Sequence, residues 1–448
     1  MQALKEVTNR HLRLQPRRSP CAEGARALAL ALALAALSAA AAADTESPWA
    51  LSGFATLGLA SKSGGHDWGF ARDQGEKGAD RDVSADVDSR AGFQLNWNGG
   101  PRWEGALQAV LRDRPYGTPA EKSLEWAYIT HRPTADVSVR LGRTSPDLFL
   151  FADSRSVGFA LPWARPPVEF YGFIPVASVD GADVSRQWNW AGAQWRGRIA
   201  GGHFSTNLGA LTTDEPLVLT DRDMMALTLS READGLLVKA SYLHTRTAVN
   251  VTPSLLQLRA GLDQLGALPV PGLGAEVDAL RSGVWTSGTG RYLGLGIQYE
   301  QGPWSLHAEG SHALIDDSPA SGLRGYLGLG YRLSSVTFYG LASRSLPRRA
   351  ARQAPDLASL VTPMLGPALG QQAQMLASGA TDAANGGRYD QRTLAGGLRW
   401  DATSNTALKL QLDRIHVHAN GSGAWRHGDA HPASATVMAV LLDFTWGQ

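Results

Sequence analysis

The chain has 448 residues, with 42 Lys and Arg against 41 Asp and Glu, and this balance excludes the basic surface that nucleic-acid binding requires. The single cysteine, Cys21, excludes a disulfide-linked scaffold. Beyond residue 43 no apolar run reaches the roughly 18 residues of a membrane-spanning helix, so an α-helical membrane protein is excluded as well.

Residues 1–43 have the composition of a secretory signal peptide. Basic residues precede the apolar run ALALALALAALSAAAAA at 27–43, and Ala41-Ala42-Ala43 fits an A-x-A cleavage site. A membrane anchor is the alternative, but alanine dominates the run and polar residues follow it at once. We therefore expect an exported chain that starts near Asp44 and forms one domain over 44–448.

From Trp49 onward, apolar residues recur at every second position, which is the period of a β-strand. Sixteen segments of about 8–14 residues show this pattern. Strands that cross a membrane need ~9–11 residues, whereas globular strands average ~5–6. The predicted strands cover 50–60, 85–98, 102–112, 122–132, 136–143, 182–190, 193–204, 222–231, 235–247, 288–300, 303–314, 322–333, 335–346, 389–401, 404–417 and 434–446.

The connections between these segments alternate in length. Short turns follow the even-numbered strands, and longer loops mostly follow the odd-numbered ones. The loops cover 61–84, 113–121, 144–181, 205–221, 248–287, 315–321, 347–388 and 418–433. This alternation is typical of outer-membrane barrels, whose short turns face the periplasm. The predicted fold class is all-β: a transmembrane antiparallel β-barrel of sixteen strands. A soluble sandwich or propeller is the alternative, and it would not explain the alternation.

The two faces of the predicted strands differ. One face is apolar and carries Trp and Tyr near the strand ends, as at Trp97 and Trp304, where aromatic side chains favour a membrane interface. The other face carries charges such as Arg112, Glu309 and Lys409. Burying so many charges in a dry core would cost several kcal/mol per ion. A water-filled lumen removes that cost, so the barrel is predicted to enclose a channel.

Three local features resemble the Gram-negative porin family. They are a first strand at Leu51–Gly58, the segment Val139–Pro146 with Gly142-Arg143 before the third loop, and a last strand at Val440–Trp446, although Gly447-Gln448 follow the terminal aromatic. The resemblance implies a sixteen-stranded homotrimer in the outer membrane, in contact with its lipid and lipopolysaccharide. It also implies passive diffusion of small hydrophilic solutes and ions, through a lumen that an infolded third loop narrows.

Segment 144–181 fits that third loop by position and composition. It is rich in aromatic residues and prolines, so it must pack against a surface, and the barrel interior is the nearest one. Acids on the loop that face bases on the wall would create a field that selects small polar solutes and ions. The predicted constriction consists of Arg90, Arg112, Arg140, Arg143, Asp147, Asp153 and Glu169. A loop-anchoring ion pair is the alternative for each acid.

Two further loops begin like helices, at Ser254 in 248–287 and at Asp356 in 347–388, with a capping residue before an apolar stripe. They would lie over the channel mouth or against neighbouring subunits.

Other functions remain as alternatives. They are a substrate-selective outer-membrane channel and a structural or adhesive barrel with binding loops. We predict no enzyme, no cofactor and no metal. The sequence has neither G-x-S-x-G nor H-E-x-x-H, and His416 and His418, two apart on one strand face, are interpreted as polar residues of the loop and the lumen.

Overall fold

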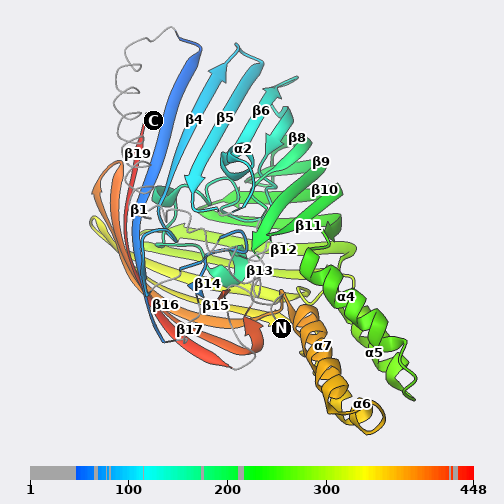
Figure 1. Cartoon of the computed structure of the whole chain (residues 1–448). Coiled ribbons are helices and arrows are strands. Elements are labelled where there is room, and N and C mark those ends of the chain that lie inside the picture. Colours follow the sequence, from blue (N-terminus) through cyan, green and yellow to red (C-terminus); the bar gives the residue numbers. More distant parts are fainter. Residues whose placement is uncertain are drawn as a thin grey trace.

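The computed structural model describes residues 47–64, 69–76, 78–79, 82–114, 116–172, 176–209, 216–422, 425–426 and 432–447. The predicted leader and its cleavage site lie outside these residues. Within them, sixteen long antiparallel strands close into a barrel, because β1 pairs with both β4 and β19 (Figure 1). The predicted sixteen-stranded barrel is confirmed.

The long strands lie close to the predicted segments. They are β1 (Trp49–Gly64), β4 (Arg90–Asn98), β5 (Trp103–Arg112), β6 (Leu124–His131), β7 (Val137–Thr144), β8 (Val179–Trp190), β9 (Ala193–Gly209), β10 (Pro216–Ala233), β11 (Leu236–Val249), β12 (Ser287–Gln301), β13 (Trp304–Ile315), β14 (Gly322–Leu333), β15 (Val336–Pro347), β16 (Tyr389–Thr403), β17 (Thr406–Ser422) and β19 (Ala433–Trp446). The strand predicted at 85–98 is β4, which starts five residues later than predicted. The reason is a turn before it, in which the amide of Ser89 donates to the carbonyl of Ala85.

Shorter elements lie in the loops. They are the two-residue strands β2 (Gly69–Phe70), β3 (Val83–Ser84) and β18 (Trp425–Arg426), and the helices α2 (Pro119–Ser123), η1 (Gly158–Ala160), α3 (Val168–Tyr171), α4 (Pro253–Gly266), α5 (Leu273–Gly283), α6 (Leu357–Leu365) and α7 (Pro367–Asn385). Among the described residues, no helix is both long and apolar enough to cross a membrane.

The outer face of the barrel is an apolar belt of solvent-exposed side chains. Leu295 on β12 and Leu394 on β16 are examples, with 52% and 66% of their surface exposed. Aromatic pairs lie beside the short turns: the rings of Trp188 and Trp195 are stacked with centroids 6.4 Å apart. Trp126 departs from this pattern. It lies opposite Gln108 on the lumen face, as alternation from the exposed Ile129 requires, and the irregularity in the β5–β6 register falls beside it, at Glu125.

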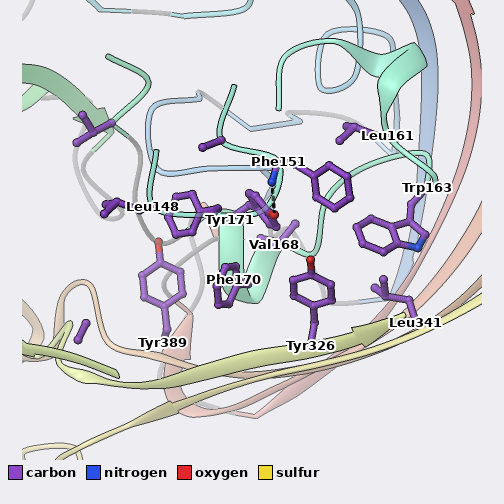
Figure 2. Close-up of a cluster of buried hydrophobic side chains, with 14 of the residues drawn as sticks. Leu148, Phe151, Leu161, Trp163, Val168, Phe170, Tyr171, Tyr326, Leu341 and Tyr389 are labelled. Carbon is purple, nitrogen blue, oxygen red and sulfur yellow. Dashed lines mark hydrogen bonds between the residues drawn. The ribbon is translucent and has the colours of Figure 1, made fainter. Parts of the chain in front are cut away.

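The third loop folds into the barrel. Its helix α3 contacts β13, β14, β15 and β16, and η1 contacts β1 and β19. Aromatic residues of the loop, including Trp163, Phe170 and Tyr171, pack against Tyr326 of the wall and form the largest buried apolar cluster (Figure 2). The predicted infolding is therefore confirmed, and the loop contributes much of the hydrophobic interior that a hollow barrel lacks.

Two helical hairpins extend from the long-loop end of the barrel, α4–α5 and α6–α7 (Figure 1). Their apolar faces pack together through residues such as Leu262, Val277 and Val361. Asp356 caps α6 by accepting a hydrogen bond from the Ser359 amide at 3.0 Å, as predicted. The other predicted helix begins slightly earlier, because Thr252 rather than Ser254 provides the cap of α4.

Candidate pore constriction

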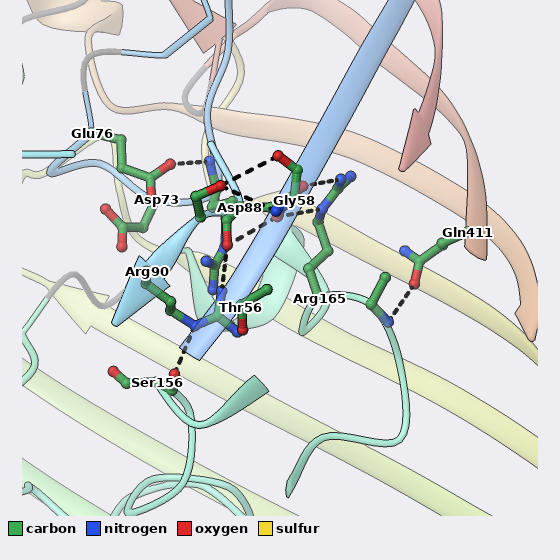
Figure 3. Close-up of polar contacts among 12 residues, drawn as sticks. Thr56, Gly58, Asp73, Glu76, Asp88, Arg90, Ser156, Arg165 and Gln411 are labelled. Atoms are coloured by element: carbon green, nitrogen blue, oxygen red, sulfur yellow. Dashed lines mark hydrogen bonds and ion pairs between the residues drawn. The ribbon is translucent and has the colours of Figure 1, made fainter. Parts of the chain in front are cut away.

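A buried arginine fixes the third loop to the wall. The guanidinium of Arg165 donates to Asp88 at 2.6 Å and to Asp413 of β17 at 2.7 Å, and only 2% of its side chain is exposed (Figure 3). It also lies 4.9 Å from the ring centroid of Phe70 in the first loop. Burial opposes ionisation of Asp88, but Arg165 outweighs it and lowers the pKa of this carboxyl. Removing either partner of such a buried pair is costly.

A lysine fixes the next part of the loop. Lys409 on β17 donates to the backbone carbonyls of Gly158 and Leu161, both at 2.7 Å. Its ammonium group also lies 3.0 Å from Asp443 of β19, and the hydroxyl of Thr56 donates to the same aspartate. These bonds hold the η1 turn of the loop against β1, β17 and β19.

Glu169 is a third anchor. Its carboxylate accepts hydrogen bonds from Ser343 of β15 and Gln391 of β16, each at 2.6 Å, and also from Thr393. Only 1% of the residue is exposed. Glu169 therefore points into the wall, and we assign it to loop attachment rather than to the lining of the passage.

Arg90 and Arg112 contact the loop at one place, Ser156. Arg90 donates to the Ser156 carbonyl at 2.6 Å, and Arg112 lies 3.5 Å from the Ser156 hydroxyl. The acid partner of Arg112 is Glu125 of β6, at 2.5 Å, and not an acid of the loop. The two arginines thus lie on the lumen face as predicted, but they bind the loop backbone and a wall acid instead of Asp147 or Asp153.

Arg140 and Asp147 belong to a second charged group. Arg140 on β7 pairs with Asp183 of β8 at 3.0 Å, and Arg198 of β9 pairs with the same carboxylate at 2.9 Å. Arg198 also lies 3.3 Å from Asp147, which accepts a hydrogen bond from Lys239 of β11. Bases and acids therefore alternate across β7, β8, β9 and β11, and the third loop contributes Asp147 to this network.

Asp153 is the predicted loop acid that remains exposed to solvent, although the barrel wall surrounds it. The surrounding protein and the neighbouring Asp147 raise the pKa of the Asp153 carboxyl, while Arg140 and Lys239 partly oppose that shift. An exposed carboxylate on a loop inside a barrel attracts cations and repels anions that pass within a few Å of it.

Arg143 lies on the other face of its strand. It pairs with Asp180 through two hydrogen bonds of 2.7 Å. On the neighbouring strands Arg143 lies opposite Ala127 and Asp180, and along its own strand it follows Gly142, which faces the lumen. Because side chains alternate along a strand, Arg140 and Arg143, three residues apart, face opposite ways. Arg143 is therefore left out of the constriction that we propose.

The first loop also enters the lumen, which the sequence did not reveal. Arg114 pairs with Asp73 at 2.6 Å and, against the effect of burial, lowers the pKa of Asp73. Burial and the Asp73 charge raise the pKa of Glu76 to about 7. β2 of this loop pairs with β18, and the rings of Phe70 and Trp425 lie 5.4 Å apart. In the sequence, the aromatic residue Phe70 within a loop rich in charges was the feature that could have indicated this packing.

The chain matches one protein family in sequence and is similar in fold to several solved structures. A family model described as Gram-negative porin matches residues 27–420. Solved structures with a similar fold include an anion-selective porin from Comamonas acidovorans, with 12% identity over 90% of this chain and 100% of that chain and a TM-score of 0.48. Another is OprB of Pseudomonas putida, with 11% identity over 89% and 94% of the two chains and a TM-score of 0.48. No curated protein matches the sequence.

Proposed function

The chain belongs to the Gram-negative porin family and is an outer-membrane diffusion channel, and from this premise we propose how its passage is built. Small hydrophilic solutes and ions pass between the third loop and the wall formed by β7, β8, β9 and β11. Asp153, Asp147, Arg140 and Lys239 line this constriction, while Glu169, Arg165 and Lys409 hold the loop in place.

The main support for this proposal is the difference in exposure along the third loop. Asp153 is exposed to solvent, whereas the loop residues Arg165 and Glu169 are almost fully buried. The loop is therefore attached on one side and open to water on the side of Asp153. Charged groups that line a narrow passage determine which ions enter it.

A more selective channel is the second candidate. The first, third and last long loops all contribute to the interior, through Phe70, Trp163 and Trp425. Three interlocked loops narrow a lumen more than one loop would. Such a passage favours a restricted class of small solutes, and the mixed charges around Asp147 would suit solutes that carry both signs.

We also propose a homotrimer whose contact surface is the wall of short strands. β6 and β7 have 8 residues each, whereas β8 has 12 and β10 has 18. A tilted strand of eight residues rises only about 20 Å, less than the ~25 Å apolar belt of an outer-membrane barrel. Contact with other subunits would cover this low wall, and lipid and lipopolysaccharide would cover the taller remainder.

Asp153→Asn should shift ion preference toward anions in planar bilayers. A unit charge a few Å from a permeating ion contributes about 0.5–1 kcal/mol in water, so the K⁺ over Cl⁻ permeability ratio should fall roughly two- to fivefold. Because the pKa of Asp153 is raised, mild acid should produce the same shift in the unmodified protein and not in the variant.

Asp180→Asn is the matched control, since Asp180 pairs with Arg143 on the outer face. Reversal potentials in a salt gradient measure both variants. Equal shifts in the two, or no shift in Asp153→Asn, would remove Asp153 from the passage.

A further inference from the structure

A basic patch covers the outer face of the barrel at the long-loop ends of β15, β16 and β17. Its members face away from the lumen because they alternate with buried inward residues such as Thr393 and Ile415. The patch consists of Arg344, Arg392, Arg414, His416 and His418. The sequence-based assignment of the two histidines to the lumen is therefore wrong, because the buried Ile415 and Val417 between and beside them occupy the inward positions.

Like charges are adjacent within this patch. Arg344 lies directly opposite Arg392 on neighbouring strands, and Arg392 lies directly opposite His416. Directly opposed residues have Cβ atoms about 4.5–5.5 Å apart, and like charges in such positions are destabilising. The rings of His416 and His418 are also in contact, with centroids 4.6 Å apart. An anion bound between the two arginines would relieve their repulsion, and the neighbouring imidazole rings offer further hydrogen-bond donors.

Protein acids balance only part of this charge. On the outer face of β15, β16 and β17, within the described residues, the one carboxylate is Asp390, which is already shared by Arg344 at 2.6 Å and Arg388 at 3.1 Å. Arg392 is exposed and forms no ion pair with any residue that the structure describes. Among the described residues, Arg414 donates only to the neutral hydroxyl of Thr436, at 2.8 Å.

The position of the patch identifies its ligand. One residue pair closer to the short turns, the same strands expose Leu394 and Leu412, with 66% and 53% of their surface accessible, and these belong to the apolar belt. The patch therefore lies at the boundary between acyl chains and headgroups, on the side of the long loops. Short turns face the periplasm, so this boundary is that of the outer leaflet.

We propose that this patch binds the phosphate groups of outer-leaflet lipid, with Arg392 and Arg414 as the main contacts and Leu394 and Leu412 against the acyl chains. Arginine suits this role because its planar fork matches phosphate oxygens. The inference depends on the outer-membrane location of the barrel and is independent of which solutes cross it.

The test compares two triple variants of the full chain purified in detergent. The first is Arg344→Gln with Arg392→Gln and Arg414→Gln. The control, Arg246→Gln with Arg281→Gln and Arg349→Gln, removes the same charge from exposed arginines that have acid partners in Asp223, Asp263 and Asp317. The probes are lipid A with two phosphates, phosphatase-treated lipid A, and inorganic phosphate, and native mass spectrometry reports binding.

We expect phosphorylated lipid A to bind the unmodified chain and the control equally, and to bind the patch variant about 100-fold more weakly, since each arginine near a membrane surface contributes roughly a factor of five. Equal affinity for the patch variant, an equal loss in the control, or equal binding of the phosphatase-treated lipid would overturn the assignment. Inorganic phosphate binding as tightly as lipid A would overturn the lipid as the source. Ion conductance of the patch variant should be unchanged, so a failure of the channel proposal would be seen separately.

Discussion

Replacing Arg165 by methionine should release the third loop and increase both the size and the fluctuation of the single-channel current. The substitution leaves Asp413 buried without its cation and leaves Asp88 with only the more distant Arg72, at 3.8 Å, and such broken pairs cost about 3–5 kcal/mol. The barrel itself is closed by a continuous ladder of hydrogen bonds, so the loop should yield before the wall does. Conductance recordings and limited proteolysis within 144–181 measure this release.

Two further variants make that experiment decisive. Arg132→Met removes an exposed arginine that pairs with Glu104, and it should leave the current unchanged because surface ion pairs contribute little. Arg165→Met combined with Asp88→Asn and Asp413→Asn removes the unpaired charges and should restore most of the original conductance. If Arg165→Met behaved like Arg132→Met, the loop would be held by other contacts.

Leu295→Arg should nearly abolish insertion of the barrel into membranes. Leu295 lies on the outer face of β12 between Ala240 and Gly310, and 52% of its surface is exposed. An arginine facing lipid near mid-bilayer costs ~2–4 kcal/mol. Heat-modifiable electrophoretic mobility of membrane fractions measures the folded, inserted population.

Gln298→Arg provides the comparison on the same strand. Gln298 has the opposite parity, so its side chain faces the lumen, where it donates to Glu300 at 3.0 Å. The new charge would meet water and a carboxylate, and insertion should be close to that of the unmodified chain. Comparable losses for both variants would contradict the face assignment.

The strands could be predicted because period-2 alternation and loop lengths are local properties of the sequence. The third loop could be assigned for a related reason: seven aromatic residues and several prolines in a loop demand a packing surface. The same alternation, applied to Arg140 and Arg143, already places them on opposite faces, so the error at Arg143 was avoidable.

The role of each loop acid could not be read from the sequence. Glu169 and Asp153 are similar carboxylates in one loop. Glu169 accepts hydrogen bonds from Ser343 and Gln391, which are remote in the chain, whereas Asp153 is exposed to solvent. Their difference comes from how the loop rests on the wall. The position of the first loop inside the barrel could not be predicted for the same reason, because the partner of Phe70 is Trp425, near the other end of the chain.

The most direct measurement of the central claim is chemical labelling of Asp153→Cys during conductance recording. Cys21, the one cysteine of the sequence, lies in the predicted signal peptide, so the variant would present a single thiol. A positively charged methanethiosulfonate reagent should reduce the current in discrete steps and shift selectivity toward anions. The same reagent should leave the current of Met375→Cys unchanged, because Met375, with 69% of its surface exposed, lies in the middle of α7, and α7 extends out from the barrel (Figure 1). Complete modification of Asp153→Cys, verified by mass, with an unaltered current would show that the third loop does not line the passage.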